Sequence, residues 1–213
     1  VSAALYKFIE DFSDNKKTKY KCIEDFLKNN YPDIKSLKSG EAIIDYSKDI
    51  IDQSINAVKR LNSSFLLIQG PPGAGKTYTS AKIILSLIKD KKKVGINSNS
   101  HKAINNLLLK IEELAAEENF KFEGFKKSSK EVDRFNGKNI KESRIELVTK
   151  NCLIYAGTAW LFSDVRLDQQ LDYVFIDEAG QVSLANSIAI ATTTKNIVLI
   201  GDQMQLSQPI KGT

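Results

Sequence analysis

An apolar run that leads directly into a glycine-rich octapeptide constrains this chain more than any other feature. Residues 65–68 read Phe-Leu-Leu-Ile, and residues 70–77 read Gly-Pro-Pro-Gly-Ala-Gly-Lys-Thr. In such a loop successive backbone N–H groups turn inward around phosphates, the lysine reaches the β- and γ-phosphates, and the threonine hydroxyl ligates Mg²⁺. The sequence therefore predicts a strand and a loop that binds a nucleoside triphosphate, with ATP and Mg²⁺ as the expected cofactors.

The residues after the octapeptide predict a helix, because Ala81, Ile84, Leu85 and Ile88 recur with helical spacing. The phosphates would then face a helix N-terminus, whose backbone N–H groups and dipole favour anions. We expect Lys76 to be catalytic and the Thr77 hydroxyl to ligate the metal. The expected nucleotide contacts are the loop residues Gly70, Pro71, Pro72, Gly73, Ala74, Gly75, Lys76 and Thr77.

Further apolar runs alternate with segments of helical periodicity. Besides residues 65–68, strands are expected at 94–97, 152–156, 173–176 and 197–200, and helices at about 42–61 and 101–118. Such alternation predicts an α/β fold with a parallel sheet and helices on both faces. The pattern from residue 5 to about 31 suggests two short amphipathic helices. We expect residues 1–45 to be a helical accessory segment and residues 46–213 to form the nucleotide-binding domain.

Positive charge is concentrated in one segment of this 213-residue chain, whose formal net charge is +5. Residues 121–150 hold nine Lys or Arg against five Asp or Glu. Because residues 119–150 are polar and weakly periodic, we expect a basic insertion that leaves the core. It is either a solvated loop or a surface that faces a nucleic acid. In the second case, charge reversal at Lys126, Lys127 and Lys130 should weaken binding.

Signals for membrane insertion and secretion are missing from this sequence. It contains no run of about 18 apolar residues and no charged-then-apolar leader. We therefore expect no membrane partner and an intracellular, cytoplasmic protein. Cys22 and Cys152 lie far apart, without the paired spacing of a metal site or a disulfide framework, so both are expected to be reduced.

Two of the apolar runs end in polar signatures. Residues 174–176 continue into Asp177-Glu178-Ala179-Gly180-Gln181, and residues 197–200 continue into Gly-Asp-Gln-Met-Gln-Leu at 201–206. Because the carboxyl ends of parallel strands meet at one edge, both signatures should lie beside the phosphate loop. Asp177 would hold Mg²⁺ and Glu178 would deprotonate the attacking water. The alternatives are a helix N-cap with an acidic first turn and a simple turn after a strand.

These three signatures, in this order at strand ends, resemble motifs I, II and III of superfamily 1 helicases. The Asp-Glu-Ala-x-Gln form and Gln69 before the loop resemble the branch that contains the nonsense-mediated-decay helicase and senataxin. Within that branch, the stretches at 94–108, 157–162 and 177–186 are most similar to microbial proteins that fuse a RecB-type nuclease domain to such a helicase. The resemblance covers about residues 50–213.

The resemblance implies a RecA-like P-loop NTPase domain and assigns roles around the nucleotide. Asp177 would take the metal, Glu178 would be the catalytic base, and Gln205 would be a catalytic residue that senses the γ-phosphate. Gln181 would contact the nucleotide and link its site to neighbouring motifs. Gln53 matches the adenine-reading glutamine of this branch, with a glutamine on a helix surface as the alternative.

The resemblance also implies contacts to single-stranded DNA or RNA. Residues 98–102 fit motif Ia, whose polar groups and helix N-terminus grip strand phosphates, and residues 157–158 resemble a further phosphate-contacting motif. The implied contacts are Ser98, Asn99, Ser100, His101, Lys102, Gly157 and Thr158. The single tryptophan, Trp160, either stacks on a base or belongs to the core.

The function implied is that of an ATP-hydrolysing motor domain of a nucleic-acid helicase or translocase. No second series of strands and helices and no later arginine motif follows, so the resemblance extends only to the first motor domain. A second RecA-like domain, and possibly a RecB-type nuclease domain, would be partners within one protein, and this part alone would hydrolyse ATP weakly. Alternatives are a nucleotide-gated DNA clamp that regulates a nuclease and, less favoured, a small-molecule phosphotransferase.

Overall fold

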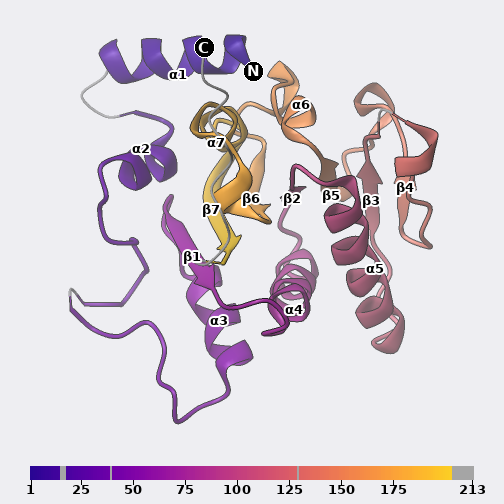
Figure 1. Cartoon of the computed structure of the whole chain (residues 1–213), viewed down its shortest axis with the longest axis horizontal. Helices are drawn as coiled ribbons and strands as arrows, with labels where there is room; N and C mark the ends of the chain where they lie inside the picture. Colours follow the sequence, from indigo (N-terminus) through magenta and orange to yellow (C-terminus); the bar gives the residue numbers. More distant parts are fainter. Residues whose placement is uncertain (15–17, 39, 129, 203–213) are drawn as a thin grey trace.

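A parallel β-sheet forms the centre of the molecule (Figure 1). The structure, a computed structural model, describes residues 1–14, 18–38, 40–128 and 130–202. Within them the sheet has seven strands in the order β1-β7-β6-β2-β5-β3-β4, and all neighbours pair in parallel. The strands are β1 (Phe65–Gln69), β2 (Val94–Asn97), β3 (Glu123–Lys126), β4 (Ile140–Glu142), β5 (Cys152–Gly157), β6 (Leu171–Ile176) and β7 (Thr194–Gly201). The five strands expected from the sequence are confirmed.

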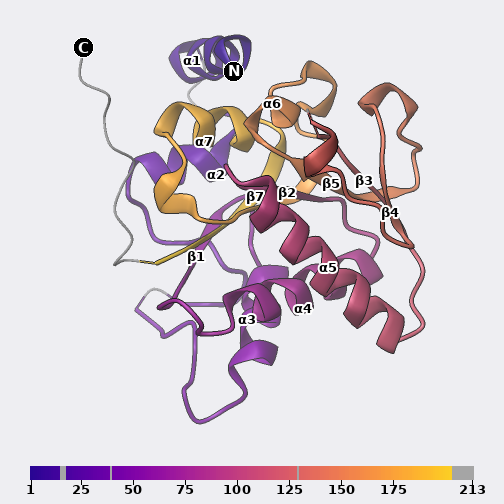
Figure 2. The ribbon, with the colours of Figure 1, turned by 45° about the vertical axis from the view of Figure 1, so that its right-hand side comes forward.

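Helices cover both faces of this sheet (Figure 2). One face carries α3 (Ile50–Lys59), α4 (Lys76–Lys89) and α5 (His101–Glu117). The other carries α2 (Lys21–Leu27), α6 (Ala159–Phe162) and α7 (Leu184–Ala191), and α1 (Ser2–Asp14) packs on α7. Short 3₁₀ helices lie at η1 (Glu131–Asp133), η2 (Ile145–Leu147), η3 (Val165–Leu167) and η4 (Ala179–Gln181). The predicted fold class is confirmed. Among the described helices, none has the length and apolar character needed to cross a membrane.

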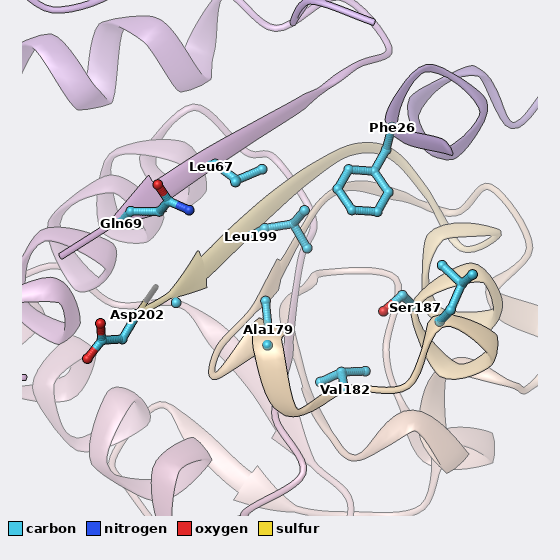
Figure 3. A pocket seen from close by; sticks show the side chains of 11 residues that line it. Phe26, Leu67, Gln69, Ala179, Val182, Ser187, Leu199 and Asp202 are labelled. Atoms are coloured by element: carbon cyan, nitrogen blue, oxygen red, sulfur yellow. The ribbon is translucent and has the colours of Figure 1, made fainter. Parts of the chain in front are cut away.

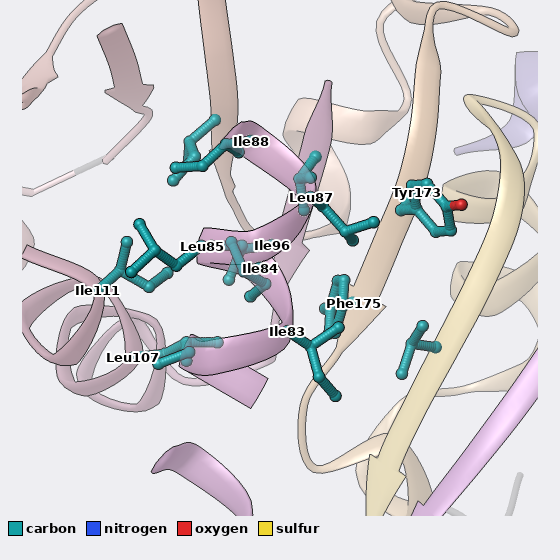
Figure 4. Packing of buried hydrophobic residues seen from close by; sticks show 14 of the residues in the cluster. Ile83, Ile84, Leu85, Leu87, Ile88, Ile96, Leu107, Ile111, Tyr173 and Phe175 are labelled. Carbon is teal, nitrogen blue, oxygen red and sulfur yellow. The ribbon is translucent and has the colours of Figure 1, made fainter. Parts of the chain in front are cut away.

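The alternation of side chains along each strand creates two apolar cores. Ile96 and Phe175, for example, belong to the core between the sheet and α4, where Ile84 and Leu87 meet them (Figure 4). Each of these side chains is at most 1% exposed. Burial of one such side chain contributes about 1.5–3 kcal/mol. The packing therefore fixes α4, and with it the loop at its N-terminus.

The N-terminal segment completes the second core. Phe8 of α1 and Ile23 of α2 join the cluster on the face that α7 covers. The Tyr20 hydroxyl donates to the Asp168 carboxylate at 3.0 Å, which ties this segment to the chain just before β6. The two helices expected here are present, and they pack directly on the sheet and on α7. The domain boundary near residue 45 stays a prediction.

The helix expected from about residue 42 begins only at Ile50. The Asp49 carboxylate caps it by accepting hydrogen bonds from the N–H groups of Ile51 (2.9 Å) and Asp52 (2.8 Å). Upstream, the Asp45 carboxylate accepts from the Ser47 N–H and forms a turn. Local side-chain hydrogen bonds of this kind compete with helix formation, so the apolar residues at 43–44 do not continue the helix.

The expectation that residues 119–150 leave the core is wrong. They contribute β3 and β4, which extend the sheet beyond β5. Glu112 of α5, only 9% exposed, anchors this edge. Its carboxylate accepts from the N–H of Asn139 (2.8 Å), the side-chain amide of Asn139 (2.8 Å) and the N–H of Ile140 (2.9 Å). Strands of four and three residues are too short to give a periodic signal.

Candidate nucleotide and nucleic-acid site

The ends of four neighbouring strands bring the sequence signatures together. Strand order places β1, β7, β6 and β2 side by side, all parallel, so their carboxyl ends share one edge. The N–H of Gly70 donates to the carbonyl of Gly201 at 3.3 Å, which joins the phosphate loop to the end of β7. The N–H of Asp177 donates to the carbonyl of Asn97 at 2.8 Å, which joins the ends of β6 and β2.

The phosphate loop has the backbone that its glycines permit. Gly73 and Gly75 adopt φ angles of +79° and +78°, in the left-handed region that side chains with a β-carbon disfavour. Gly75 is the N-cap of α4, which begins at Lys76. The Lys76 ammonium donates to the carbonyls of Gly70 and Pro71, the latter at 2.8 Å. A γ-phosphate would compete for this ammonium, which already lies inside the loop.

The carboxylates of the second signature differ in environment. Burial raises the pKa of Asp177, and the neighbouring Glu178 carboxylate also raises it, while the Glu178 N–H bonded to Asp177 Oδ1 at 2.9 Å and the Lys76 ammonium lower it. Glu178 adopts a left-handed backbone with φ 53° and ψ 41°, uncommon for a residue with a β-carbon. The Gln181 N–H donates to the Glu178 carbonyl at 2.8 Å and closes η4 behind it.

The donors present fit a magnesium ion held jointly with a nucleotide. Mg²⁺ is typically bound by one or two carboxylates together with substrate phosphates, and it keeps oxygen ligands. Asp177 supplies a carboxylate that burial makes costly to ionise without a cation, and the exposed Thr77 stands in the first turn of α4. The described residues hold no cluster of three or more His, Cys, Asp or Glu side chains, so the nucleotide would complete the coordination.

The predicted adenine reader, Gln53, lies in α3 and holds the turn before that helix. Its side-chain oxygen accepts from the Asp45 N–H at 2.6 Å, and its amide nitrogen donates to the carbonyls of Asp45 (2.7 Å) and Asp49 (3.2 Å). The edge of adenine offers the same combination of a donor and an acceptor. Adenine would therefore have to replace the Asp45 contacts.

The predicted motif Ia residues diverge in orientation. Ser98 is fully buried, and its hydroxyl donates to Glu178 Oε2 at 3.3 Å. Asn99 is exposed, and its side-chain amide donates to the Gln181 carbonyl at 2.6 Å. Ser100 caps α5 by accepting from the Ala103 N–H at 3.3 Å. Lys102 is exposed in the first turn. This segment thus contacts the carboxylate loop directly, while Asn99 and Lys102 reach solvent.

His101 lies between the helix N-terminus and the segment after β3. Burial and the nearby Lys126 ammonium lower its pKa, and its Nδ1 has no hydrogen-bond partner within the described part of the chain. Lys126 itself is fully buried, and its ammonium donates to the Ser128 hydroxyl at 2.8 Å and to the Asp133 carbonyl. Lys126 is therefore not the surface cation that the basic segment suggested, whereas Lys127 and Lys130 are exposed.

The second motif predicted to bind nucleic acid, residues 157–158, lies at the end of β5. Gly157 is buried, and its carbonyl accepts from the side-chain amide of Asn97 at 3.1 Å. A β-carbon at Gly157 would lie 3.0 Å from side-chain atoms of Leu161, so α6 packs tightly against this position and a larger residue would have to displace Leu161 slightly. Thr158 is partly exposed. Trp160 is 74% exposed, so the alternative that places it in the core is wrong.

Sequence reasoning left Trp160 undecided and missed the partner of Ser98. In α6, a helix of four residues, Ala159, Leu161 and Phe162 are buried and Trp160 is the exposed member. The signal in the sequence that could have indicated an exposed Trp160 was its place in Gly-Thr-Ala-Trp, directly after a buried β-strand. No signal in the sequence pairs Ser98 with Glu178, 80 residues apart. Gln205 lies outside the described residues.

A separate cavity of about 310 Å³ opens beside this edge (Figure 3). It lies on the face that α2 and α7 cover, with Phe26 and Leu199 among its apolar lining and with Gln69 and Asp202 near the strand ends. Its lining includes none of the loop residues 70–77. The cavity is therefore not the phosphate site, although β1 and β7 contribute to both.

Comparisons with known proteins show which family and which relatives this chain is similar to. The family model AAA_30, described as an AAA domain, matches residues 52–213. The DNA replication ATP-dependent helicase/nuclease dna2 of Schizosaccharomyces pombe is 26% identical over 198 residues, which cover 81% of this chain and 13% of that protein. The ATP-dependent helicase NAM7 of Saccharomyces cerevisiae is 28% identical over an alignment of 257 residues, gaps included, and the alignment covers 92% of this chain and 26% of that protein.

A solved structure supports the fold. A nuclease-deletion mutant of the Type ISP restriction-modification enzyme LlaGI, in complex with a DNA substrate mimic, aligns with a TM-score of 0.50 at 16% identity, covering 80% of this chain and 19% of that one. The chain spans about a quarter or less of the curated relatives named above. It belongs to the AAA domain family AAA_30 and is a superfamily 1 helicase motor domain related to NAM7.

Proposed function

We propose that this chain is the ATP-binding motor domain of a longer protein that couples ATP hydrolysis to movement along a single nucleic-acid strand. The observation that carries the proposal is the contact between two predicted sites. The segment expected to bind the strand, residues 98–102, is hydrogen-bonded to the loop expected to hydrolyse ATP, through Ser98 to Glu178 and through Asn99 to Gln181. A strand and a nucleotide would therefore act on the same few residues.

The roles at the nucleotide follow from the positions of the side chains. The Lys76 ammonium would leave its loop carbonyls for the β- and γ-phosphates, and the N–H groups of the loop would surround them. Mg²⁺, held by Thr77 and Asp177, would neutralise charge on the phosphates. Glu178 would accept a proton from the water that attacks the γ-phosphorus, so that ADP leaves as the new P–O bond forms.

The nucleic-acid strand would bind on the solvent side of the sheet edge that the carboxyl ends of the β-strands form. Asn99, Lys102 and the N-terminus of α5 would contact phosphates, and Trp160 would stack on a base. Because the name of the Schizosaccharomyces pombe relative places that protein in DNA replication, single-stranded DNA is the first substrate to test, with RNA as the second.

The remaining predictions concern the longer protein. A second RecA-like domain would close on the nucleotide and supply arginines, Gln205 would sense the γ-phosphate, and Gln53 and Gln181 would contribute to nucleotide binding. A RecB-type nuclease domain in the same protein, a basic surface at Lys127 and Lys130, and a cytoplasmic location stay predictions from the sequence.

The test is ATP hydrolysis by the chain in single turnover, with and without a 30-nucleotide poly-dT or poly-U strand. We expect slow hydrolysis that the strand accelerates, loss of nucleotide binding in Lys76→Ala, and retained binding with a loss of rate of about 10²–10⁴-fold in Glu178→Gln. Hydrolysis that neither variant changes would refute the proposal. Strand binding without any effect on the rate would instead favour a nucleotide-gated clamp.

A further inference from the structure

Ser98 is buried, which is unexpected for a residue of a segment predicted to bind a nucleic-acid strand. It directly follows β2 at the shared strand edge, yet it is 0% exposed, while its neighbour Asn99 is exposed. A side chain without access to solvent cannot take a strand phosphate unless the segment rearranges. The hydroxyl must therefore serve another partner.

The hydrogen bonds of the Ser98 hydroxyl identify that partner. Its oxygen accepts from the Ser100 N–H at 3.2 Å, and it donates its proton to Glu178 Oε2 at 3.3 Å. One hydroxyl has a single proton to donate, so the bond to Glu178 uses it. With Oε2 engaged by Ser98, Oε1 is the oxygen that would accept the proton of an attacking water.

The backbone around Glu178 depends on such support. Its left-handed φ of 53° is a conformation that persists only where the surroundings hold it. The Gln181 N–H holds its carbonyl at 2.8 Å, and Asn99 holds the Gln181 carbonyl at 2.6 Å. The segment 98–100 thus contacts the loop of Glu178 at the side chain and again at the backbone.

We propose that Ser98 is the positioning residue of Glu178, and that a strand bound at Asn99 and Lys102 sets the rate of ATP hydrolysis through it. This inference rests on the proposed function and adds the route of coupling to it. The cap of α5 links the two sites, because Ser100 accepts from the Ala103 N–H and donates its own N–H to Ser98, so a nucleic-acid strand held at Asn99 and Lys102 would hold the Ser98 hydroxyl in place. Ser98 then fixes the carboxylate that takes the proton from water.

The test is a double-mutant cycle on the full chain with Ser98→Ala and Glu178→Gln. We expect Ser98→Ala to lower the single-turnover rate about 10- to 100-fold, the range of a hydrogen bond to a charged group. It should also abolish the acceleration by poly-dT. The affinities for ATP and for poly-dT should be unchanged, because the hydroxyl touches neither. In the Glu178→Gln background the same substitution should have no further effect.

A matched control separates positioning from packing. Ser80 of α4 is 1% exposed, and its hydroxyl has no partner among the described residues. Ser80→Ala should leave the rate and the acceleration by the strand unchanged. An equal loss of rate from Ser98→Ala in both Glu178 backgrounds, or no loss in either, would overturn the inference. A wild-type chain that does not hydrolyse ATP at all would refute the proposed function instead.

Discussion

The N–H of Asp177 donates to the carbonyl of Asn97 over 2.8 Å. This hydrogen bond joins the end of β6, which leads into the predicted metal ligand Asp177, to the end of β2, which leads into the segment predicted to bind nucleic acid. Asn97 also donates its side-chain amide to the Gly157 carbonyl at 3.1 Å. One buried asparagine thus connects the ends of β6, β2 and β5. The nucleotide and nucleic-acid motifs are held in a single layer.

Asp177→Asn should stabilise the fold and abolish hydrolysis. Burial raises the pKa of Asp177, so the ionised carboxylate destabilises the native state at pH 7, and stability falls as pH rises through the ordinary carboxyl range. Asparagine keeps an acceptor for the Glu178 N–H without the charge. We expect a higher Tm at pH 7 and a gain that vanishes below about pH 4, where the carboxyl is protonated in both states. A lower Tm at pH 7 would contradict this.

Glu112→Ala should detach β4 from α5. The substitution leaves three hydrogen-bond donors of Asn139 and Ile140 without their acceptor. Only Ile140 is buried, whereas Asn139 is partly exposed and can turn to water, and a buried donor left without a partner costs about 1–3 kcal/mol. We expect the free energy of unfolding to fall by about 2–4 kcal/mol in urea titrations. The control is Glu113→Ala, which removes an exposed ion pair with Lys110 and should cost at most about 1 kcal/mol. Equal losses would reject the special role of Glu112.

Trp160→Ala should weaken single-strand binding. Base stacking on an aromatic side chain is typically worth about 1–3 kcal/mol per base, so we expect the Kd for poly-dT to rise about 5- to 150-fold. Tyr31→Ala is the control, because Tyr31 is 91% exposed and belongs to no predicted site. Since the chain has one tryptophan, quenching of its fluorescence reports stacking directly. Unchanged fluorescence and affinity would leave Trp160 outside the strand path.

The two thiols should be unreactive in the native state. Burial raises the pKa of Cys22 to about 12 and that of Cys152 to about 11, and only the thiolate attacks alkylating reagents. We expect iodoacetamide to label neither cysteine at pH 8 until urea unfolds the chain. Because the unfolded thiols ionise first, the free energy of unfolding should fall as pH rises above about 9. Rapid labelling of the folded chain would show that one thiol is accessible.

The sequence specified those features that depend on neighbours along the chain. The loop at 70–77, five of the strands and the pair Asp177-Glu178 are each encoded within a few residues, by glycine spacing or by an apolar run. The rule that parallel strands end at one edge then brought these motifs together. Local chemistry also decided where α3 begins, through Asp45 and Asp49, although the apolar pattern pointed earlier.

Only the tertiary structure decided which side chains the fold covers. Trp160 follows a buried strand, yet the four-residue helix α6 turns it outward, and Lys126 lies in a basic segment, yet Asp133 and Ser128 surround its ammonium. The sequence predicts that Ser98 contacts a nucleic-acid strand, yet the chain after β6 brings Glu178 to its hydroxyl. Exposure and partners of this kind depend on elements distant in sequence, because burial is a property of packed surfaces and not of local pattern.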